Sequence, residues 1–188
     1  MAKQKSFIKQ FWQEKKMVGA MSPSSKFLAN KMLNPIDFKK AQVIVELGPG
    51  TGVFTKRMLA QMQPDAKLLV FELNDTFFET LKSEINDPRM ILIHDSAEHV
   101  QKYLEANDLL QTDYVVSSLP LANFPIKLKR NIIESSYNSL KNNGKYIQFQ
   151  YSLNSKKVLE EQFQSVSLAF TPFNFPPAFV YTCTKEKN

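Results

Sequence analysis

A β-branched, apolar run at residues 42–47 leads directly into a glycine-rich turn, and this junction limits the folds that the chain can adopt. The turn, Gly48-Pro49-Gly50-Thr51-Gly52, is followed by a helical pattern over residues 53–61. A strand that passes through a tight glycine turn into a helix is typical of the parallel sheets of α/β proteins. Because glycine has no Cβ, the backbone of such a turn can come close to a ligand. The junction therefore predicts an α/β fold with a small-molecule pocket at the carboxyl end of the first strand.

The same alternation of strand and helix continues along the chain, without internal repeats or a linker long enough to separate domains. We predict strands at 67–73, 90–94, 113–117 and 145–151, and helices at 75–86, from about 97, at 126–141 and at 155–164. Two extended stretches, 165–171 and 178–184, predict a hairpin at one edge of the sheet. Apolar strands that alternate with amphipathic helices indicate a mostly parallel sheet with helices on both faces. We expect one core domain over residues 41–188 and a helical cap over residues 1–40.

The excess positive charge is confined to the N-terminal segment. Residues 1–40 hold nine lysines against two acidic residues, a balance of +7, whereas the whole chain carries +6. On a helical projection, five large apolar residues of this segment share one face, with lysines beside them: Phe7, Ile8, Phe11, Trp12 and Val18. Such an N-terminal amphipathic helix packs on its own domain, lies on an anionic membrane surface or contacts nucleic acid. The pattern alone leaves these three alternatives open.

Cysteine content and the pattern of apolar residues bear on the compartment. Cys183 is the single cysteine of the chain, so no internal disulfide can form, and it has no second ligand at metal spacing. We expect no metal site. The N-terminal residues form neither a signal-peptide core nor a run of about 20 apolar residues that spans a bilayer. These features favour a protein that is made and kept in the cytoplasm.

Carboxylates stand at the ends of three successive predicted strands. Glu46 lies two residues before the first glycine, where it repels a pyrophosphate and attracts an ammonium or sulfonium group. Val53 occupies the place of the third glycine of the dinucleotide pattern. Glu72 ends the second strand, about 20 residues after the turn, where carboxylates bind ribose hydroxyls, and Asp95 ends the third, within reach of an adenine edge. Each carboxylate alone also suits a helix N-cap, but together they predict a nucleoside site with a cationic group.

Through these residues the chain resembles the class I S-adenosylmethionine-dependent methyltransferases, in segments 46–52, 95–97 and 117–121 and at Glu72. The resemblance implies a Rossmann-like sheet of seven strands in which the last strand is antiparallel. It also implies S-adenosyl-L-methionine as the cofactor, with the glycine turn around the methionine part, Glu72 on the ribose and Asp95 with Ala97 on the adenine. The residues that we expect to bind the cofactor are Met21, Ser25, Phe27, Glu46, Gly48, Pro49, Gly50, Gly52, Glu72, Leu73, Asn74, Asp95, Ser96, Ala97 and Ser117.

Three segments, 18–29, 118–121 and 174–181, resemble the bacterial phospholipid N-methyltransferases, which are relatives of the ribosomal RNA adenine dimethylases. This resemblance implies methylation of the amine of phosphatidylethanolamine, with a phospholipid at an anionic membrane surface as the partner and no stable nucleic-acid partner. It also implies that the N-terminal amphipathic helix lies on the inner face of the membrane, so that the protein is cytoplasmic and peripherally associated. The sequence does not predict the oligomeric state.

The loop after the fourth strand distinguishes this interpretation from its nearest alternative, an RNA adenine N6-methyltransferase. Those enzymes place Asn or Asp, one further residue, Pro and an aromatic residue here, whereas the chain has Ser118-Leu119-Pro120-Leu121. Phe124 is a nearby ring that can stack on a base, so this alternative stays open, as does a non-catalytic adaptor with the same fold. We expect the Leu119 backbone and Tyr181 to line the catalytic spot, with Tyr151 as a further candidate, although tyrosines of terminal strands also commonly pack in cores.

Overall fold

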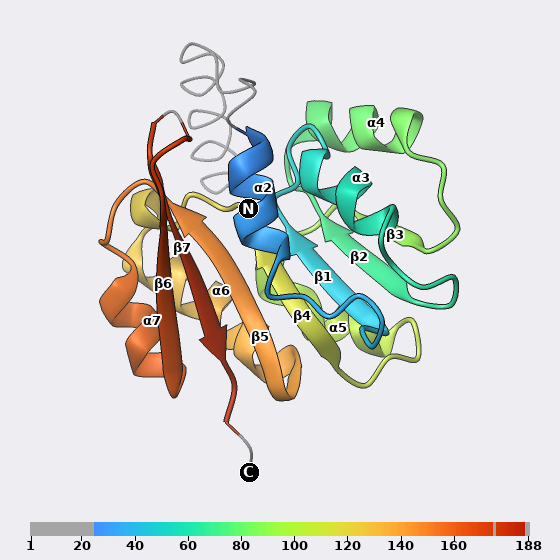
Figure 1. The fold of residues 1–188 in the computed structure, drawn as a ribbon. Coiled ribbons are helices and arrows are strands. Elements are labelled where there is room, and N and C mark those ends of the chain that lie inside the picture. The colour runs from blue at the N-terminus through green and yellow to red at the C-terminus, as the bar shows by residue number, and fades with distance from the viewer. Residues whose placement is uncertain (1–24, 175, 187–188) are drawn as a thin grey trace.

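The computed structural model describes residues 25–174 and 176–186, and within them a seven-stranded sheet forms the centre of the protein (Figure 1). The strands are β1 (Val43–Leu47), β2 (Lys67–Phe71), β3 (Met90–Ile93), β4 (Thr112–Ser117), β5 (Leu140–Gln150), β6 (Ser165–Thr171) and β7 (Ala178–Thr184). Their order is β3-β2-β1-β4-β5-β7-β6. Strands β1 to β5 are parallel, and β7 runs antiparallel to both of its neighbours. The predicted Rossmann-like, mostly parallel sheet with an antiparallel last strand is confirmed.

The C-terminal hairpin forms as predicted, and its strand order is decided by pairing rather than by sequence order. β7 inserts between β5 and β6, with Gln148 opposite Tyr181 on one side and Phe170 opposite Phe179 on the other. β6 is therefore the edge strand, and four of its seven residues are exposed. The last strand of the chain lies inside the sheet and is covered by its neighbours.

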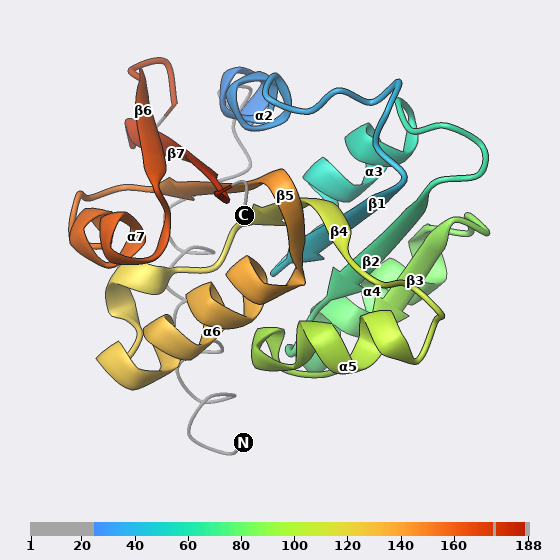
Figure 2. The same ribbon diagram turned by 90° about the horizontal axis from the view of Figure 1, so that it is seen from below.

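Helices cover both faces of the sheet, as predicted (Figure 2). One face carries α2 (Ser25–Leu33), α3 (Val53–Leu59) and α4 (Asp75–Glu84). The other face carries α5 (Val100–Glu105), α6 (Ile126–Ser139) and α7 (Lys156–Gln162). Two short 3-10 helices, η1 (Ala97–His99) and η2 (Leu121–Asn123), follow β3 and β4. Both 3-10 helices begin close to the carboxyl ends of these strands, where the sequence predicts the site.

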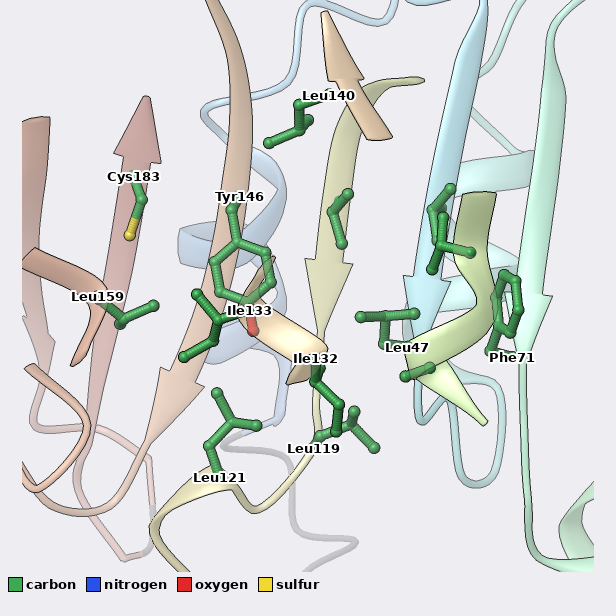
Figure 3. Packing of buried hydrophobic residues seen from close by; sticks show 14 of the residues in the cluster. Leu47, Phe71, Leu119, Leu121, Ile132, Ile133, Leu140, Tyr146, Leu159 and Cys183 are labelled. Carbon is green, nitrogen blue, oxygen red and sulfur yellow. The ribbon is translucent and has the colours of Figure 1, made fainter. Parts of the chain in front are cut away.

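Two hydrophobic clusters fill the space between the sheet and its helices, because successive residues of a strand face opposite sides. In β1, Val43, Val45 and Leu47 belong to the cluster under α5, α6 and α7, and Ile44 belongs to the cluster under α2, α3 and α4. All residues of β1 are buried, as expected for a parallel strand that is covered on both faces. Figure 3 shows part of the first cluster, whose side chains come from strands, from helices and from the loop after β4.

The connection between α6 and β5 differs from the prediction. The helix ends at Ser139, two residues earlier than predicted, and Asn143 adopts a left-handed φ of 61° within the range of β5. Pairing with β4 begins at Leu140, is interrupted and resumes at Lys145. The predicted helix stop at Asn143 is therefore an irregularity inside the strand, because Leu140 already pairs with β4 and ends the helix.

The described part of the predicted N-terminal cap, α2, packs on the sheet. Ala29 and Met32 are fully buried, and Leu28 is 5% exposed. The helix contacts α3, β5, β6 and β7. The predicted amphipathic helix lies outside the described residues, and the domain boundary at residue 40 stays a prediction. Within residues 25–174 and 176–186, no helix combines the length and the apolar character that a membrane crossing requires.

Gly52, the residue before α3, gives a test of how the turn packs on α4. Its φ is +76°, and a Cβ at this position would lie 2.7 Å from Leu81 Cδ2. We expect Gly52→Ala to lower the free energy of unfolding by about 2–4 kcal/mol, because left-handed backbone costs about 1–2 and overpacking about 1–3 kcal/mol. Chemical denaturation measures the change, with exposed Ser83→Ala on α4 as the matched control. An unchanged midpoint for Gly52→Ala would show that the turn relaxes at no cost.

Candidate active site

A crevice forms where the carboxyl ends of β1 to β4 meet at one edge of the sheet. Its wall consists of Gly48, Phe71, Glu72, Leu73, Asp95, Ser96, Ala97, Leu119, Phe124, Leu128 and Ile132. Six of the residues that we expect to bind a cofactor are among them, and they come from three different strand ends. The structure thus brings Glu72 and Asp95 of the predicted constellation to one crevice beside the glycine turn, as the parallel arrangement requires.

Gly48 determines how closely the glycine turn approaches the loop after β4. Its φ is +70°, and a Cβ on it would lie 2.6 Å from Leu119 Cδ2. Any side chain at this position would therefore either strain the backbone or push Leu119 away. The absence of a side chain leaves the turn backbone open to the crevice.

Glu72 connects the glycine turn to the end of β2. Only 2% of it is exposed, and its Oε2 and Oε1 accept hydrogen bonds from the backbone N–H groups of Gly50 (3.2 Å) and Asn74 (2.8 Å). Burial raises the pKa of Glu72 to about 7, although these backbone donors act in the opposite direction. A carboxylate that is fixed in this way has lone pairs left for two ribose hydroxyls.

Glu46 is fully buried and does not form part of the crevice wall. Its Oε2 accepts a hydrogen bond from Thr55 Oγ1 at 2.6 Å, and its Oε1 has no hydrogen-bond partner in the described part of the chain. Burial raises the pKa of Glu46 to about 8, and the charge of Glu72 adds to this shift. An unpaired, buried carboxyl oxygen fits a positively charged ligand group, which would favour the ionised form.

Asp95 forms a fixed, ionised part of the crevice wall. Its Oδ1 accepts a hydrogen bond from the Ser96 N–H at 2.7 Å and lies 3.1 Å from His99 Nδ1. Its Oδ2 accepts a hydrogen bond from the Tyr103 hydroxyl at 3.0 Å. Burial alone would raise the pKa of Asp95, but the hydrogen bonds from Ser96, His99 and Tyr103 hold it below the ordinary value.

A second pocket, called the acceptor pocket below, adjoins the crevice at Leu119, which lines both. Its wall consists of Ser118, Leu119, Pro120, Ala122, Asn123, Phe149, Gln150, Tyr151 and Ser152. The loop after β4 therefore separates a crevice with carboxylates from a pocket with aromatic walls. Leu119 is the residue that the two pockets share, and its catalytic role stays a prediction. Tyr151, the further candidate, also lines this pocket.

The structure places Tyr181, which we expected at the catalytic spot, away from both pockets. Its side chain is fully buried in the hydrophobic cluster that also contains Val158 and Leu159 of α7. It lines neither the crevice nor the acceptor pocket. The reason is the sheet order, because β7 is an internal strand and α7 covers this side of it.

Among the described residues, the other predicted cofactor residues are not part of the crevice wall. Phe27 is 55% exposed and packs on Phe173 at a ring distance of 5.6 Å, because α2 lies over the C-terminal hairpin. Asn74 caps α4, where its side chain accepts a hydrogen bond from the N–H of Phe77. The others that are absent from the wall are Pro49, Gly50, Gly52 and Ser117. Met21 and the side chain of Ser25 lie outside the described part of the structure.

Sequence reasoning missed the apolar side of the crevice. Leu128 and Ile132 lie four residues apart on α6, so the same face of that helix presents both of them to the crevice. Their helical spacing, directly after the loop that follows β4 (residues 118–121, called the acceptor loop below), is a sequence feature that could have predicted an apolar wall. Phe71, the residue before Glu72, resembles any other buried strand residue, and nothing local distinguishes it.

The two buried glutamates predict a pH dependence of stability. The folded protein raises the pKa of Glu46 from 4.5 to about 8, so the folded state holds this proton more tightly than the unfolded state. The contribution of this proton to the free energy of unfolding is complete below about pH 4.5 and is lost as the pH rises through about 8. We therefore expect Glu46→Gln to flatten the decline of the unfolding free energy over this range by up to about 1.4 kcal/mol per pH unit.

Denaturation at a series of pH values measures this slope. Glu79→Gln, which changes an exposed glutamate on α4, is the control and should leave the slope as it is. If Glu46→Gln also left it unchanged, Glu46 would already be ionised in the folded protein.

The chain matches a known protein family and several named proteins. Residues 15–158 match the family described as ribosomal RNA adenine dimethylase. An ornithine lipid N-methyltransferase of Singulisphaera acidiphila is 28% identical over 183 residues, which are 96% of this chain and 95% of that protein. A ribosomal RNA small subunit methyltransferase A of Mycoplasmopsis synoviae is 30% identical over 128 residues, which are 68% of this chain and 45% of that protein.

Solved structures show the same fold at low sequence identity. N-methyltransferase NodS of Bradyrhizobium japonicum, in complex with S-adenosyl-L-homocysteine, has a TM-score of 0.66 at 9% identity, over 87% of this chain and 86% of that chain. An rRNA methylase of Streptococcus thermophilus has a TM-score of 0.63 at 16% identity, over 89% of this chain and 99% of that chain.

The family match covers most of the chain and includes the glycine turn, the acidic strand ends and the acceptor loop. The chain is an S-adenosylmethionine-dependent methyltransferase, and it belongs to the ribosomal RNA adenine dimethylase family.

Proposed function

We propose that the protein methylates the amine of a membrane phospholipid, phosphatidylethanolamine, at the surface of an anionic membrane. The observation that carries this proposal is the make-up of the acceptor loop. Where RNA adenine N6-methyltransferases place an aromatic residue after proline, this chain has Leu121, which is fully buried in the core. Where those enzymes place an amide or a carboxylate, it has Ser118. The loop therefore lacks, at these positions, the groups that hold a base.

The crevice residues fit the cofactor. When bound, S-adenosyl-L-methionine would supply a methyl group to an unprotonated amine nitrogen, with the electron pair of the broken C–S bond left on sulfur and one proton lost from the nitrogen. Gly48 leaves room for the methionine part, and the unpaired Oε1 of Glu46 suits its positive charge. Glu72 would hold the ribose, and Asp95 borders the adenine. The contribution of the protein is mainly to position the two reactants.

Two further observations support a lipid substrate. The ornithine lipid N-methyltransferase that matches nearly the whole chain acts, by its name, on the amine of a lipid. The nine lysines of residues 1–40 suit anionic head groups, and the large apolar residues between them suit the bilayer interface. On this basis we propose that the protein is cytoplasmic and peripherally bound to the inner face of the membrane.

A second candidate function is methylation of an adenine in RNA. The family match and the relative from Mycoplasmopsis synoviae favour it, since both carry names of ribosomal RNA methyltransferases. Phe124 offers a ring on the crevice wall, although only 6% of it is exposed. The match covers 45% of that relative.

The role of Glu72 in cofactor binding can be measured directly. We expect Glu72→Ala to weaken the binding of S-adenosyl-L-methionine by about 1–3 kcal/mol, because the ribose hydroxyls lose hydrogen bonds to a charged acceptor. Isothermal titration calorimetry gives the affinity, and exposed Glu79→Ala on α4 is the control. Equal affinities for the two variants would remove Glu72 from the binding site.

The substrate is tested with labelled cofactor and vesicles that contain phosphatidylethanolamine, followed by separation of the lipids. We expect label in the mono-, di- or trimethylated lipid, and more of it with anionic than with neutral vesicles at low salt, because salt screens the attraction of the lysines. Parallel reactions contain ornithine lipid or ribosomal RNA in place of phosphatidylethanolamine.

The parallel reactions separate the candidates. Label in ornithine lipid alone would keep a lipid amine as the substrate but replace the head group. Label in RNA and none in any lipid would contradict the proposal and establish the second candidate.

A further inference from the structure

The carbonyl oxygen of Leu119 accepts hydrogen bonds from two side-chain amides. Gln148 and Gln150 of β5 each place Nε2 at 3.0 Å from this oxygen. The three residues are buried, with exposed fractions of 8% for Leu119, 0% for Gln148 and 4% for Gln150. A carbonyl oxygen has two lone pairs. Both are in use, so this carbonyl has no lone pair left for the amine of a substrate.

The partners of the two glutamines determine which way their amides face. The backbone N–H of Ala122 can only donate, and it lies 3.2 Å from Gln150 Oε1, so Nε2 must face Leu119. Gln148 Nε2 also donates to the Phe149 carbonyl at 2.7 Å. Turning either amide over would bring two oxygens, or two donors, together.

Tyr146 completes the arrangement from inside the core. Its hydroxyl donates to Gln148 Oε1 at 2.7 Å and thereby holds the second amide. In Figure 3 the ring of Tyr146 lies among the buried side chains, with its hydroxyl directed toward the end of the sheet where Leu119 and Leu121 lie. The carbonyl of the acceptor loop is thus fastened to β5 by a buried hydrogen-bond network.

The hydroxyl of Ser118, in contrast to the Leu119 carbonyl, has no hydrogen-bond partner among the described residues. Ser118 lines the acceptor pocket and is 6% exposed. A buried hydroxyl without a partner costs free energy, which a bound donor would recover. Ser118 also directly precedes Leu119, so the unpartnered hydroxyl and the engaged carbonyl belong to adjacent residues of this loop.

We propose that Ser118 Oγ holds the substrate amine, and that Gln148 and Gln150 are positioning residues that keep the Leu119 carbonyl out of amine recognition, so that the site selects an alkyl amine over an aromatic one. This inference rests on the proposed function. The nitrogen of an alkyl amine is tetrahedral and has a free lone pair, so one acceptor is enough to orient it. The amino nitrogen of adenine is conjugated with its ring, and two acceptors are needed to make it tetrahedral. With the Leu119 carbonyl engaged by both glutamines, the Ser118 hydroxyl has to act without it.

The test compares Ser118→Ala, Ser118→Thr and Gln150→Met with the unaltered protein, on phosphatidylethanolamine vesicles and on adenosine. We expect Ser118→Ala to raise the KM for the lipid about tenfold, in line with the loss of one hydrogen bond. Ser118→Thr, which keeps the hydroxyl, should restore most of the loss. Calorimetry with glycerophosphoethanolamine should show the same weakening without turnover, while the affinity for the cofactor stays unchanged.

Gln150→Met tests the positioning role, because it frees one lone pair of the Leu119 carbonyl. We expect the ratio of adenosine methylation to lipid methylation to rise at least about tenfold, a change that a merely structural role would not produce. Ser83→Ala and Gln101→Met, both on exposed helix surfaces, are the matched controls. Thermal unfolding and cofactor affinity show whether each variant is folded, and Ser118→Ala remains decisive if Gln150→Met is not.

Three outcomes are distinguishable. If the unaltered protein methylates lipid and Ser118→Ala equals it in KM and in head-group binding, the inference is overturned and the proposed function stands. An unchanged ratio for folded Gln150→Met overturns the positioning role. If the unaltered protein methylates no lipid amine, the proposed function fails and the inference fails with it.

Discussion

Three backbone hydrogen bonds at the carboxyl edge of the sheet hold the functional end of the protein together. Each extends a strand ladder by one residue, and they run from Gly48 N to Phe71 O (2.9 Å), from Glu72 N to Ile93 O (3.0 Å) and from Ser118 N to Leu47 O (2.9 Å). The glycine turn, the acidic end of β2 and the acceptor loop therefore begin at defined points of adjacent strands. Loss of these partners would leave buried backbone groups unpaired, which costs free energy. The parallel register that these bonds maintain places the crevice and the acceptor pocket side by side at Leu119.

The electrostatics of this edge differ from one strand end to the next. Glu46 and Glu72 are buried near each other, and burial raises the pKa of both. Without a bound ligand, these two carboxyl groups therefore keep their protons to a higher pH than exposed glutamates do. Asp95 has three hydrogen-bond partners, and they hold its pKa below the ordinary value. A cationic group bound close to Glu46 and Glu72 would favour the ionised form of both carboxyls, whereas the hydrogen bonds to Asp95 already favour its ionised form. The carboxyls of Glu46 and Glu72 can therefore change their protonation when a cation binds, whereas that of Asp95 is ionised beforehand.

Local patterns predicted the elements of the sheet well, because each depends on neighbouring residues. The strand, glycine turn and helix from Val43 to Leu59 and the acidic strand ends at Glu72 and Asp95 were all found from spacing and residue type. The side chain of Tyr181 faces the core because β7 inserts between β5 and β6. The position of Phe27 depends on how α2 crosses the hairpin. No local pattern contains either piece of information.

The sequence by itself determined the fold class, the cofactor chemistry and the identity of the acceptor loop, because hydrophobic period, glycine placement and strand-end carboxylates are properties of neighbouring residues. Only the tertiary structure decided which polar atoms of that loop remain available. Gln148 and Gln150 lie about 30 residues beyond Leu119 in the chain, and nothing in the sequence shows that both amides reach its carbonyl. Hydrogen-bond saturation depends on distance and direction between strands, and those are established only when β4 and β5 pair.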